Sequence, residues 1–527
     1  MNRLVITFLL SFGFTAAAHV GSPNVFFEGR AGSYTIYSVV RPPAALPGSA
    51  DVSVQVRQSD ATSVSLLPVL WQTGREGSPA AVLAERVAGA TNLWSGQVWF
   101  LRPGSYTLQI SVNGPRGRGE AIVPVNVLGM LGRQMSPARK TGLLLMGAIL
   151  FISALVIVRV VARDASLQAG AKPDLVQFRA SRYATGVAVL LLTTGVAAGA
   201  LRWRSMDLLY RSQGVQKPEP VSAAVLSEPQ RLLLELQPAE QSLGSASWTQ
   251  LVPDHGKLMH MFLIRAPAQD VFAHLHPLRQ DGQTFLLELP PLPSGNYQLY
   301  GELTFENGLN QTLLSDLVLP EPLSPLMLPP VLATNAAGDV ICGVSTLLTN
   351  EPGKVARDMD DSWHLQQNRI ATPDHAQRAD PNGALYARLM GGYSLVFENA
   401  QAVEAGRDKL LRFAAFAPDG SEVPLQLYMG MPGHAALRRE DGSVFAHLHP
   451  SGSFSMASQQ IFRERLAMTD TRETVGRANL DPARDQTNRV LFPYEFPNPG
   501  KYRLWVQVRV GGRVLTGVYD ILVQNRG

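Results

Sequence analysis

Two kinds of hydrophobic pattern divide the 527 residues of the chain. Residues 142–162 and 184–201 are almost continuously apolar, and each run is about long enough to cross a bilayer as a helix. Most other apolar residues stand in short segments in which polar and apolar positions alternate, as they do in half-buried strands. The pattern therefore predicts a mainly β protein with a two-helix transmembrane hairpin. A pair of helices buried in a soluble core is the alternative.

A turn-and-strand motif occurs three times and predicts the number of β domains. It reads Pro-Gly-Ser-Tyr-Thr-Leu at 103–108, Ser-Gly-Asn-Tyr-Gln-Leu at 294–299 and Pro-Gly-Lys-Tyr-Arg-Leu at 499–504. Each copy leads into an alternating strand, a turn and a last apolar strand, which is typical of the closing hairpin of a β-sandwich. We therefore expect three immunoglobulin/cupredoxin-like β-sandwich domains. Their expected bounds are 19–130, 221–322 and 385–527, with 323–384 as a linker or irregular segment.

The first residues have the features of an export signal. Arg3 supplies positive charge, residues 4–14 form an apolar run, and residues 16–18 are three alanines. We predict a signal peptide at 1–18, which makes His19 the first residue of the mature chain. The two apolar runs then become transmembrane helices joined by a cytoplasmic loop at 163–183. This topology places both large parts in the periplasm, tethered to a bacterial inner membrane.

Charge and cysteine content exclude two classes of function. Charged residues make up 17% of the chain, the net charge is +4, and Lys and Arg form no dense block, so we expect no nucleic-acid partner. The single cysteine, Cys342, rules out an internal disulfide. It lies in an apolar run outside any Cys-His-Met arrangement, so electron transfer at a blue-copper site is disfavoured.

Histidines are concentrated in a second repeat. The sequence Phe-Ala-His-Leu-His-Pro stands at 272–277 and again at 445–450. Each copy has one more histidine upstream, His260 in the first and His434 in the second. Six of the ten histidines therefore belong to a duplicated pattern: His260, His274, His276, His434, His447 and His449.

Strand pairing predicts that each copy gathers its histidines at one end of a hairpin. Asp441-Gly442 is a strong two-residue turn signal, and a turn there sets His434 opposite His449. A turn centred on Ala268 likewise sets His260 opposite His276. Residues two apart on a strand share a face, so the third histidine of each copy joins the pair.

Three imidazoles on one face satisfy the ligand requirement of Zn²⁺ or copper. Thioethers are soft ligands that favour Cu(I), so the nearby methionines shift the expectation towards copper, with zinc as the alternative. The weaker candidate ligands are His255, Met259, Met429, Met431 and His19, the last as an N-terminal amine-imidazole chelate. Structural histidines and core methionines are the alternative explanation for all of these residues.

Four segments together resemble a family of uncharacterised bacterial membrane-anchored periplasmic proteins with YtkA-like and other cupredoxin- or immunoglobulin-like copper-handling domains. The segments are Asp-His-Gly-Lys-Leu-Met-His at 254–260, Tyr-Met-Gly-Met-Pro-Gly-His at 428–434 and the two Phe-Ala-His-Leu-His-Pro repeats. The resemblance covers roughly 221–320 and 385–527. It implies exported β domains that handle copper, without implying a particular activity.

The sequence thus favours a membrane-tethered periplasmic protein that binds metal through two three-histidine hairpins. Copper sequestration, delivery or sensing, with a periplasmic metal-handling partner, is the leading hypothesis. An envelope scaffold or receptor with structural histidines is the second. A metal-dependent enzyme ranks last, because the sequence offers no convincing general base and no nucleophile or phosphate-binding motif.

Overall fold

The computed structural model describes residues 19–20, 24–90, 92–130, 136–168, 170–213, 215–216, 218–228, 231–239, 248, 250–320, 358–365, 378–379, 383–469 and 487–526. The expected signal peptide, Cys342 and His375 lie outside them, as does most of the expected linker at 323–384. The chain divides into two compact units, residues 129–216 and the remainder.

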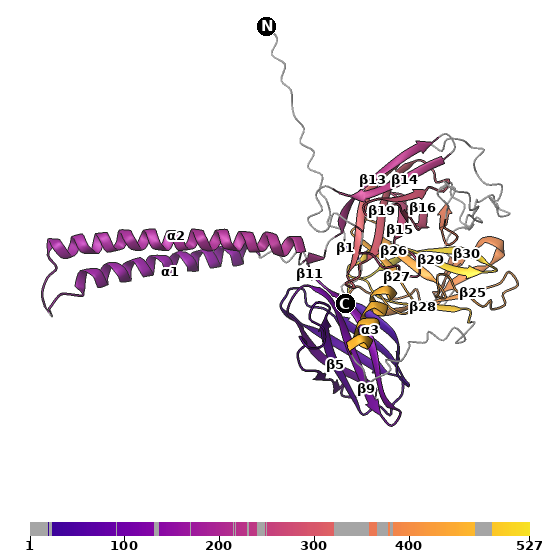
Figure 1. Ribbon diagram of the computed structural model, residues 1–527, viewed down its shortest axis with the longest axis horizontal. Helices are drawn as coiled ribbons and strands as arrows, with labels where there is room; N and C mark the ends of the chain where they lie inside the picture. Colours follow the sequence, from indigo (N-terminus) through magenta and orange to yellow (C-terminus); the bar gives the residue numbers. More distant parts are fainter. Residues whose placement is uncertain are drawn as a thin grey trace, which may run out of the picture. The chain divides into compact units, whose positions relative to one another are not determined.

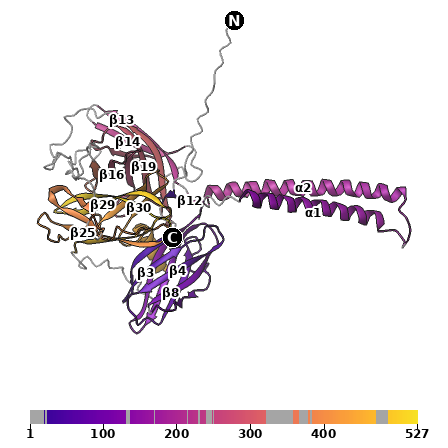
Figure 2. The same ribbon diagram turned by 180° about the vertical axis from the view of Figure 1, so that it is seen from behind.

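The smaller unit is a hairpin of two long helices, drawn side by side in Figures 1 and 2. They are α1 (Pro137–Asp164) and α2 (Leu175–Gln213), and the expected apolar runs lie inside them. The short strands β11 (Gly129–Met130) and β12 (Val215–Gln216) pair in parallel at the base of the hairpin. Both helices are long and apolar enough to cross a membrane, and their most apolar stretches bury nothing. That exposure argues against core helices of a soluble domain.

The first sandwich packs two sheets around one apolar core. The first sheet contains, in spatial order, β2 (Val25–Ala31), β3 (Tyr34–Arg41), β4 (Gly48–Val56), β8 (Leu93–Phe100) and β7 (Glu85–Arg86). The second contains β10 (Gly117–Val127), β9 (Gly104–Gly114), β5 (Ser63–Leu70) and β6 (Val82–Leu83). Alternate residues of both sheets, such as Val52, Val54, Leu108 and Ile110, fill the space between them.

The second sandwich is one sheet of nine strands that folds over on itself. Its order is β17 (Leu278–Arg279), β18 (Phe285–Glu288), β14 (Arg231–Pro238), β13 (Glu219–Glu228), β20 (Asn310–Leu319), β19 (Gly295–Thr304), β15 (His260–Arg265), β16 (Val271–Leu275) and β21 (Ser362–Leu365). Strand β13 joins the two layers, since its first residues pair with β20 and the rest pair with β14. Strand β21 comes from the segment expected to be irregular and extends the sheet beside β16.

The third sandwich has two five-stranded sheets. One contains β1 (His19–Val20), β27 (Val444–Leu448), β26 (His434–Arg439), β29 (Gly500–Val510) and β30 (Arg513–Val523). The other contains β22 (Arg378–Ala379), β23 (Leu385–Arg388), β24 (Ser394–Phe397), β25 (Asp408–Phe416) and β28 (Arg489–Glu495). A short 3₁₀ turn, Met390–Gly392, joins β23 to β24, and helix α3 (Met456–Thr469) follows β27.

The repeated Tyr-x-Leu motif forms the closing hairpin of each sandwich, as predicted. The hairpins are β9–β10, β19–β20 and β29–β30. In each, the buried tyrosine donates its hydroxyl hydrogen to a carbonyl oxygen four residues upstream: Tyr106 to Arg102 at 3.1 Å, Tyr297 to Pro293 at 2.7 Å, and Tyr502 to Asn498 at 2.8 Å. The expected fold class, mainly β with three sandwiches and a pair of apolar helices, is confirmed.

The three sandwiches belong to one compact unit, and the segment after β27 connects them. The Glu28 amide donates to the Ser451 carbonyl at 2.9 Å, and Phe454 is inserted into the core of the first sandwich. Helix α3 then lies on that sandwich, where the Gln459 side-chain amide donates to the Ile122 carbonyl at 2.7 Å (Figure 1).

Candidate metal centre

The alternation of β16 and β27 explains the Phe-Ala-His-Leu-His-Pro repeat. In β16 the side chains of Val271, Ala273 and Leu275 face the core of the second sandwich. The alternate positions, Phe272, His274 and His276, therefore point out of it. Strand β27 does the same in the third sandwich, with Val444, Ala446 and Leu448 in its core and Phe445, His447 and His449 outside.

These outer faces of the two sandwiches pack against each other. Tyr300 stacks on Phe445 with ring centroids 3.9 Å apart, and Phe272 stacks on Trp505 at 4.9 Å. Phe262 completes this aromatic layer. The histidines continue the same faces beyond the aromatic residues, so all of them are buried between the two domains.

The predicted register is confirmed in both hairpins. Met261 pairs with Leu275, and Ala435 pairs with Leu448. Continuing each ladder by one residue sets His260 across from His276 and His434 across from His449. The two hairpins face each other, because the His260 ring lies 5.5 Å from the His447 ring and the His274 ring lies 5.6 Å from it.

Two groups of imidazole nitrogens arise, each with its donor atoms within 4.8 Å of one another. The first is the expected trio of His260, His274 and His276. The second consists of His255, His434 and His449, so His255 takes the place that the sequence assigned to His447. His255 stands in a tight turn of the second sandwich with a φ of 51°, so the second group draws ligands from both domains.

His447 lies between the two groups. Its ring centroid is 4.4 Å from that of His449, 5.6 Å from that of His434 and 5.5 Å from that of His260. Its Nδ1 donates to Glu302 Oε2 of the second sandwich at 2.9 Å. The cluster therefore contains seven of the ten histidines.

Oxygen acceptors fix the tautomer of four imidazoles. In each case Nδ1 lies within hydrogen-bonding distance of an oxygen: His274 to Gln507 Oε1 at 2.9 Å, His276 to Asp361 Oδ1 at 2.9 Å, His447 to Glu302 Oε2 at 2.9 Å, and His449 to the Phe454 carbonyl at 3.3 Å. A carboxylate or carbonyl oxygen can only accept, so Nδ1 carries a proton, and Nε2 of the neutral ring has the lone pair. Metal-binding histidines are oriented in the same way.

Several buried imidazole nitrogens have no hydrogen-bond partner. They are Nε2 of His255, His276, His447 and His449, and both ring nitrogens of His434. His434 is 1% exposed. Buried polar atoms are normally paired, so unpaired nitrogens concentrated in one place mark a candidate ligand site.

The contact between His260 and His274 is the strongest indication of a ligand site in the cluster. His260 Nε2 donates to the Asp254 carbonyl at 3.1 Å, which leaves a lone pair on Nδ1. That lone pair faces the lone pair of His274 Nε2 across 3.2 Å. Two lone pairs repel unless a cation lies between them. Nitrogens bound to one tetrahedral ion at about 2.0 Å are about 3.3 Å apart, which matches this separation.

Burial favours the neutral form of five of the imidazoles. It lowers the pKa of His260, His274, His434 and His449 well below the usual value, and the neighbouring imidazoles act in the same direction. Burial also lowers the pKa of His255, although the Asp254 carboxylate opposes it. Neutral imidazole is the form that binds metal ions, so the site holds its ligands ready.

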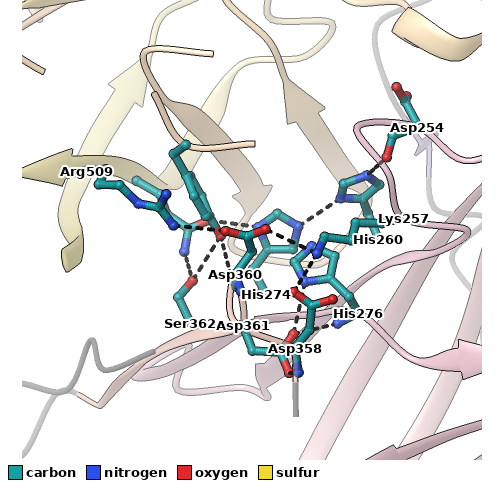
Figure 3. A network of polar contacts seen from close by, with 12 residues as sticks. Asp254, Lys257, His260, His274, His276, Asp358, Asp360, Asp361, Ser362 and Arg509 are labelled. Atoms are coloured by element: carbon teal, nitrogen blue, oxygen red, sulfur yellow. Dashed lines mark hydrogen bonds and ion pairs between the residues drawn. The ribbon is translucent and has the colours of Figure 1, made fainter. Parts of the chain in front are cut away.

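A polar network from the turn just before β21 supports the first group (Figure 3). Asp361 accepts hydrogen bonds from both the backbone amide and Nδ1 of His276, at 2.8 and 2.9 Å. Lys257 Nζ lies between Asp358 and Asp360, and Arg509 of the third sandwich pairs with Asp360 at 2.9 Å. His276, Asp358 and Asp361 also form a third group of possible metal donors. The network fixes β21 against both domains.

The remaining candidate residues lie elsewhere or lack the predicted neighbours. Met259 is buried in the core of the second sandwich, on the face opposite His260. Met429 packs with Tyr428 and Val514, and Met431 is buried in the adjoining turn. The backbone of His19 pairs with Val444 at the start of β27. The sequence favoured copper partly because the Met259 thioether could bind it. The Met259 side chain instead lies in the core of the second sandwich, away from the histidines.

Sequence reasoning missed the acceptors that orient the histidines. Glu302 and Gln507 stand on strands β19 and β29, at alternating positions that no motif marks. Asp361 belongs to Asp-Met-Asp-Asp at 358–361, an acidic cluster inside a segment of no clear pattern. Only that cluster offered a signal, since carboxylates near a histidine pattern are candidates for the hydrogen-bond partners that orient metal-binding imidazoles.

One domain of the chain matches a known family model. A family model described as a domain of unknown function (DUF8832) matches residues 388–525, which is most of the third sandwich. No curated protein matches the chain.

Several solved structures align with low similarity. A tetra-tandem repeat from the extending region of a large adhesion protein is 9% identical, with 90% of this chain and 70% of that chain covered and a TM-score of 0.15. The ICAM-5 D1–D4 ectodomain fragment is 9% identical, with 93% and 77% covered and a TM-score of 0.14. A putative membrane-anchored protein from Corynebacterium diphtheriae is 9% identical, with 95% and 96% covered and a TM-score of 0.13. Superpositions this poor carry no functional argument.

Proposed function

We propose that the protein binds a transition-metal ion in the histidine cluster between its second and third sandwiches. The observation that carries this proposal is the pair of opposed lone pairs on His260 Nδ1 and His274 Nε2, 3.2 Å apart in a buried site. Packing alone gives no reason to hold two acceptors in that position. The unpaired Nε2 atoms around them extend the same donor set.

Copper is the metal we propose, with zinc as the alternative. Imidazole nitrogen suits both metals. Burial favours the neutral form of His260, His274, His434 and His449, and the cost of desolvating an ion rises steeply with its charge. Monovalent Cu(I) therefore fits such a site better than a divalent ion. Sequestration, delivery or sensing of copper, in exchange with a periplasmic metal-handling partner, is the role that this chemistry supports.

We further propose that α1 and α2 tether the sandwiches to a bacterial inner membrane, on its periplasmic side. Two crossings return the chain to the side from which it came, and the pairing of β11 with β12 brings the two ends of the hairpin together. The export signal expected at 1–18 sets the orientation. An alkaline phosphatase reporter should be inactive when fused after residue 171 and active at the C-terminus. The reverse result would contradict this topology.

The metal proposal is tested on the full-length protein in detergent, depleted of metal and titrated with Cu(I), Cu(II) and Zn(II). A variant with both His274→Asn and His434→Asn, which removes one candidate ligand from each group of histidines, should bind copper at least tenfold more weakly. His364→Asn is the matched control, because His364 stands on β21 opposite Phe272 and outside the cluster. Equal affinities in the wild type and the double variant would overturn the proposal.

An envelope scaffold is the second candidate, and the aromatic layer favours it. The stacks of Tyr300 on Phe445 and of Phe272 on Trp505 join the sandwiches without any ion. A scaffold with structural histidines should keep its domain arrangement and its binding partners when the six repeat histidines are replaced. Loss of partner binding on metal removal alone would argue against it.

A further inference from the structure

We infer that the cluster holds two metal ions side by side, one in each group of histidines, and that the two sandwiches share the pair. This inference deepens the proposed metal-binding function and depends on it. It rests on the number of donors, on their separation into two groups and on the local charge.

The cluster contains more donors than one ion can use. A structural Zn²⁺ takes four protein ligands and a catalytic Zn²⁺ takes three, and copper takes a similar number. Seven imidazoles meet here, and the unpaired nitrogens occur around both groups: His276 in the first, and His255, His434 and His449 in the second. An ion in the first group alone would leave these buried nitrogens of the second group without a hydrogen-bond partner.

Distance separates the donors into two sets. Two nitrogens on one ion are at most about 4.2 Å apart, because each metal–nitrogen bond is about 2.1 Å long. The atoms of each trio fall within 4.8 Å of one another, close to this limit. The two trios form separate groups instead of one, so a single ion cannot bind both. The His255 ring is 6.2 Å from the His260 ring, which keeps the two sites adjacent.

His447 connects the two positions. Its Nδ1 is held by Glu302, so its free Nε2 is directed away from that carboxylate, among rings of both groups. The His447 centroid is 5.5 Å from His260 in the first group and 4.4 Å from His449 in the second. Either ion gains a fourth imidazole from this residue.

The local charge agrees with more than one cation. Asp358 and Asp360 are neutralised by Lys257 and Arg509. Among the described residues, the ion pairs of Asp254, Asp361 and Glu302 are with histidines and none is with a lysine or arginine. In the part of the chain that the structure describes, three acidic side chains without a lysine or arginine partner therefore border the histidine cluster, where a cation in each group would lie close to them.

The test counts copper in metal-free full-length protein saturated with Cu(I) in detergent under anaerobic conditions. Two ions per chain are expected for the wild type. His276→Asn, which removes a ligand of the first group only, and His449→Asn, which removes one of the second, should each retain about one ion. The double variant should retain none, and His364→Asn should retain two. X-ray absorption on the wild type should show a copper–copper vector that both single variants lack.

The outcomes separate the two proposals. No tight copper in the wild type would overturn the metal-binding function itself. One ion in the wild type, lost equally in both single variants, would leave that function in place and overturn the two-ion centre. Thermal unfolding shows whether each variant is folded. It therefore distinguishes copper lost because a ligand is missing from copper lost because the variant has unfolded. A single variant that unfolds is replaced by His276→Gln or His449→Gln.

Discussion

His434 is the clearest case in the cluster of a buried side chain whose unpaired polar atoms lower the stability of the fold. It is fully buried, yet neither of its ring nitrogens has a hydrogen-bond partner. A buried polar group without a partner costs about 1–3 kcal/mol, and an apolar side chain of similar size avoids that cost. One ring nitrogen of the neutral imidazole carries a lone pair, and the proposed ion would give that lone pair a partner.

His434→Leu should therefore raise the free energy of unfolding of the metal-free protein by about 1 kcal/mol. The same variant should bind copper more weakly and gain less stability when copper is added. Thermal unfolding with and without Cu(I) measures both effects. A clear loss of stability in the metal-free variant would contradict this prediction. It would show that the His434 imidazole has a stabilising partner in the metal-free protein.

Asp361 acts on the site through His276. Its Oδ1 accepts from Nδ1 of that histidine and from its backbone amide, so the carboxylate both orients the ring and makes its Nε2 more basic. Asp361→Asn keeps the shape and removes the charge. We expect copper affinity to fall about 10- to 100-fold. Asp520→Asn, at an exposed pair with Arg503, is the control and should leave the affinity unchanged.

At the scale of elements, the segment between β27 and α3 is the least expected feature of the fold. It begins directly after His449 and inserts Phe454 into the core of the first sandwich, next to Phe27. The Phe454 carbonyl also accepts the Nδ1 hydrogen of His449. One short segment thus connects a candidate ligand to a domain that carries no histidine repeat.

Phe454→Ala should lower the free energy of unfolding by about 3 kcal/mol, because it removes a buried aromatic ring and leaves a cavity. Leu522→Ala, at an exposed position of the third sandwich, should change it by less than about 0.5 kcal/mol. Thermal unfolding of the two variants makes the comparison. Equal midpoints would show that the segment does not hold the first sandwich.

The elements and the histidine faces followed from the sequence, while their mutual arrangement did not. Alternation gave β16 and β27 their inner and outer faces, and the Asp441-Gly442 turn gave the register of the second hairpin. Both are local properties. The opposition of the hairpins, the substitution of His255 for His447 and the roles of Glu302 and Gln507 depend on packing between domains. Nothing within a single strand determines that packing.

At the scale of the whole molecule, a pair of acids joins the first and third sandwiches. Asn24 donates to Glu495 at 2.7 Å, and Arg41 pairs with Asp408 beside it. Burial, with Asp408 acting in the same direction, raises the pKa of Glu495 to about 7. The folded protein therefore binds a proton here more tightly than the unfolded chain does.

This pKa predicts the direction of a pH effect on stability. A carboxyl whose folded pKa is raised stabilises the fold fully below its unfolded pKa, near 4.5, and loses that contribution as pH rises through about 7. The stability of the wild type relative to Glu495→Gln should therefore fall between pH 5 and pH 8. Thermal midpoints of the two proteins at both pH values test this, and a parallel pH response would contradict it.

The insertion of Phe454 into the first sandwich also has a consequence for the order of biosynthesis. The candidate ligands lie at 255–276 and 434–449, and the segment that follows closes onto residues made before either helix of the hairpin. The centre is therefore completed only after nearly the whole chain has left the ribosome. A nascent chain that ends before residue 449 lacks a candidate ligand of the second group, so loading of the proposed ions in both groups would follow synthesis of most of the chain.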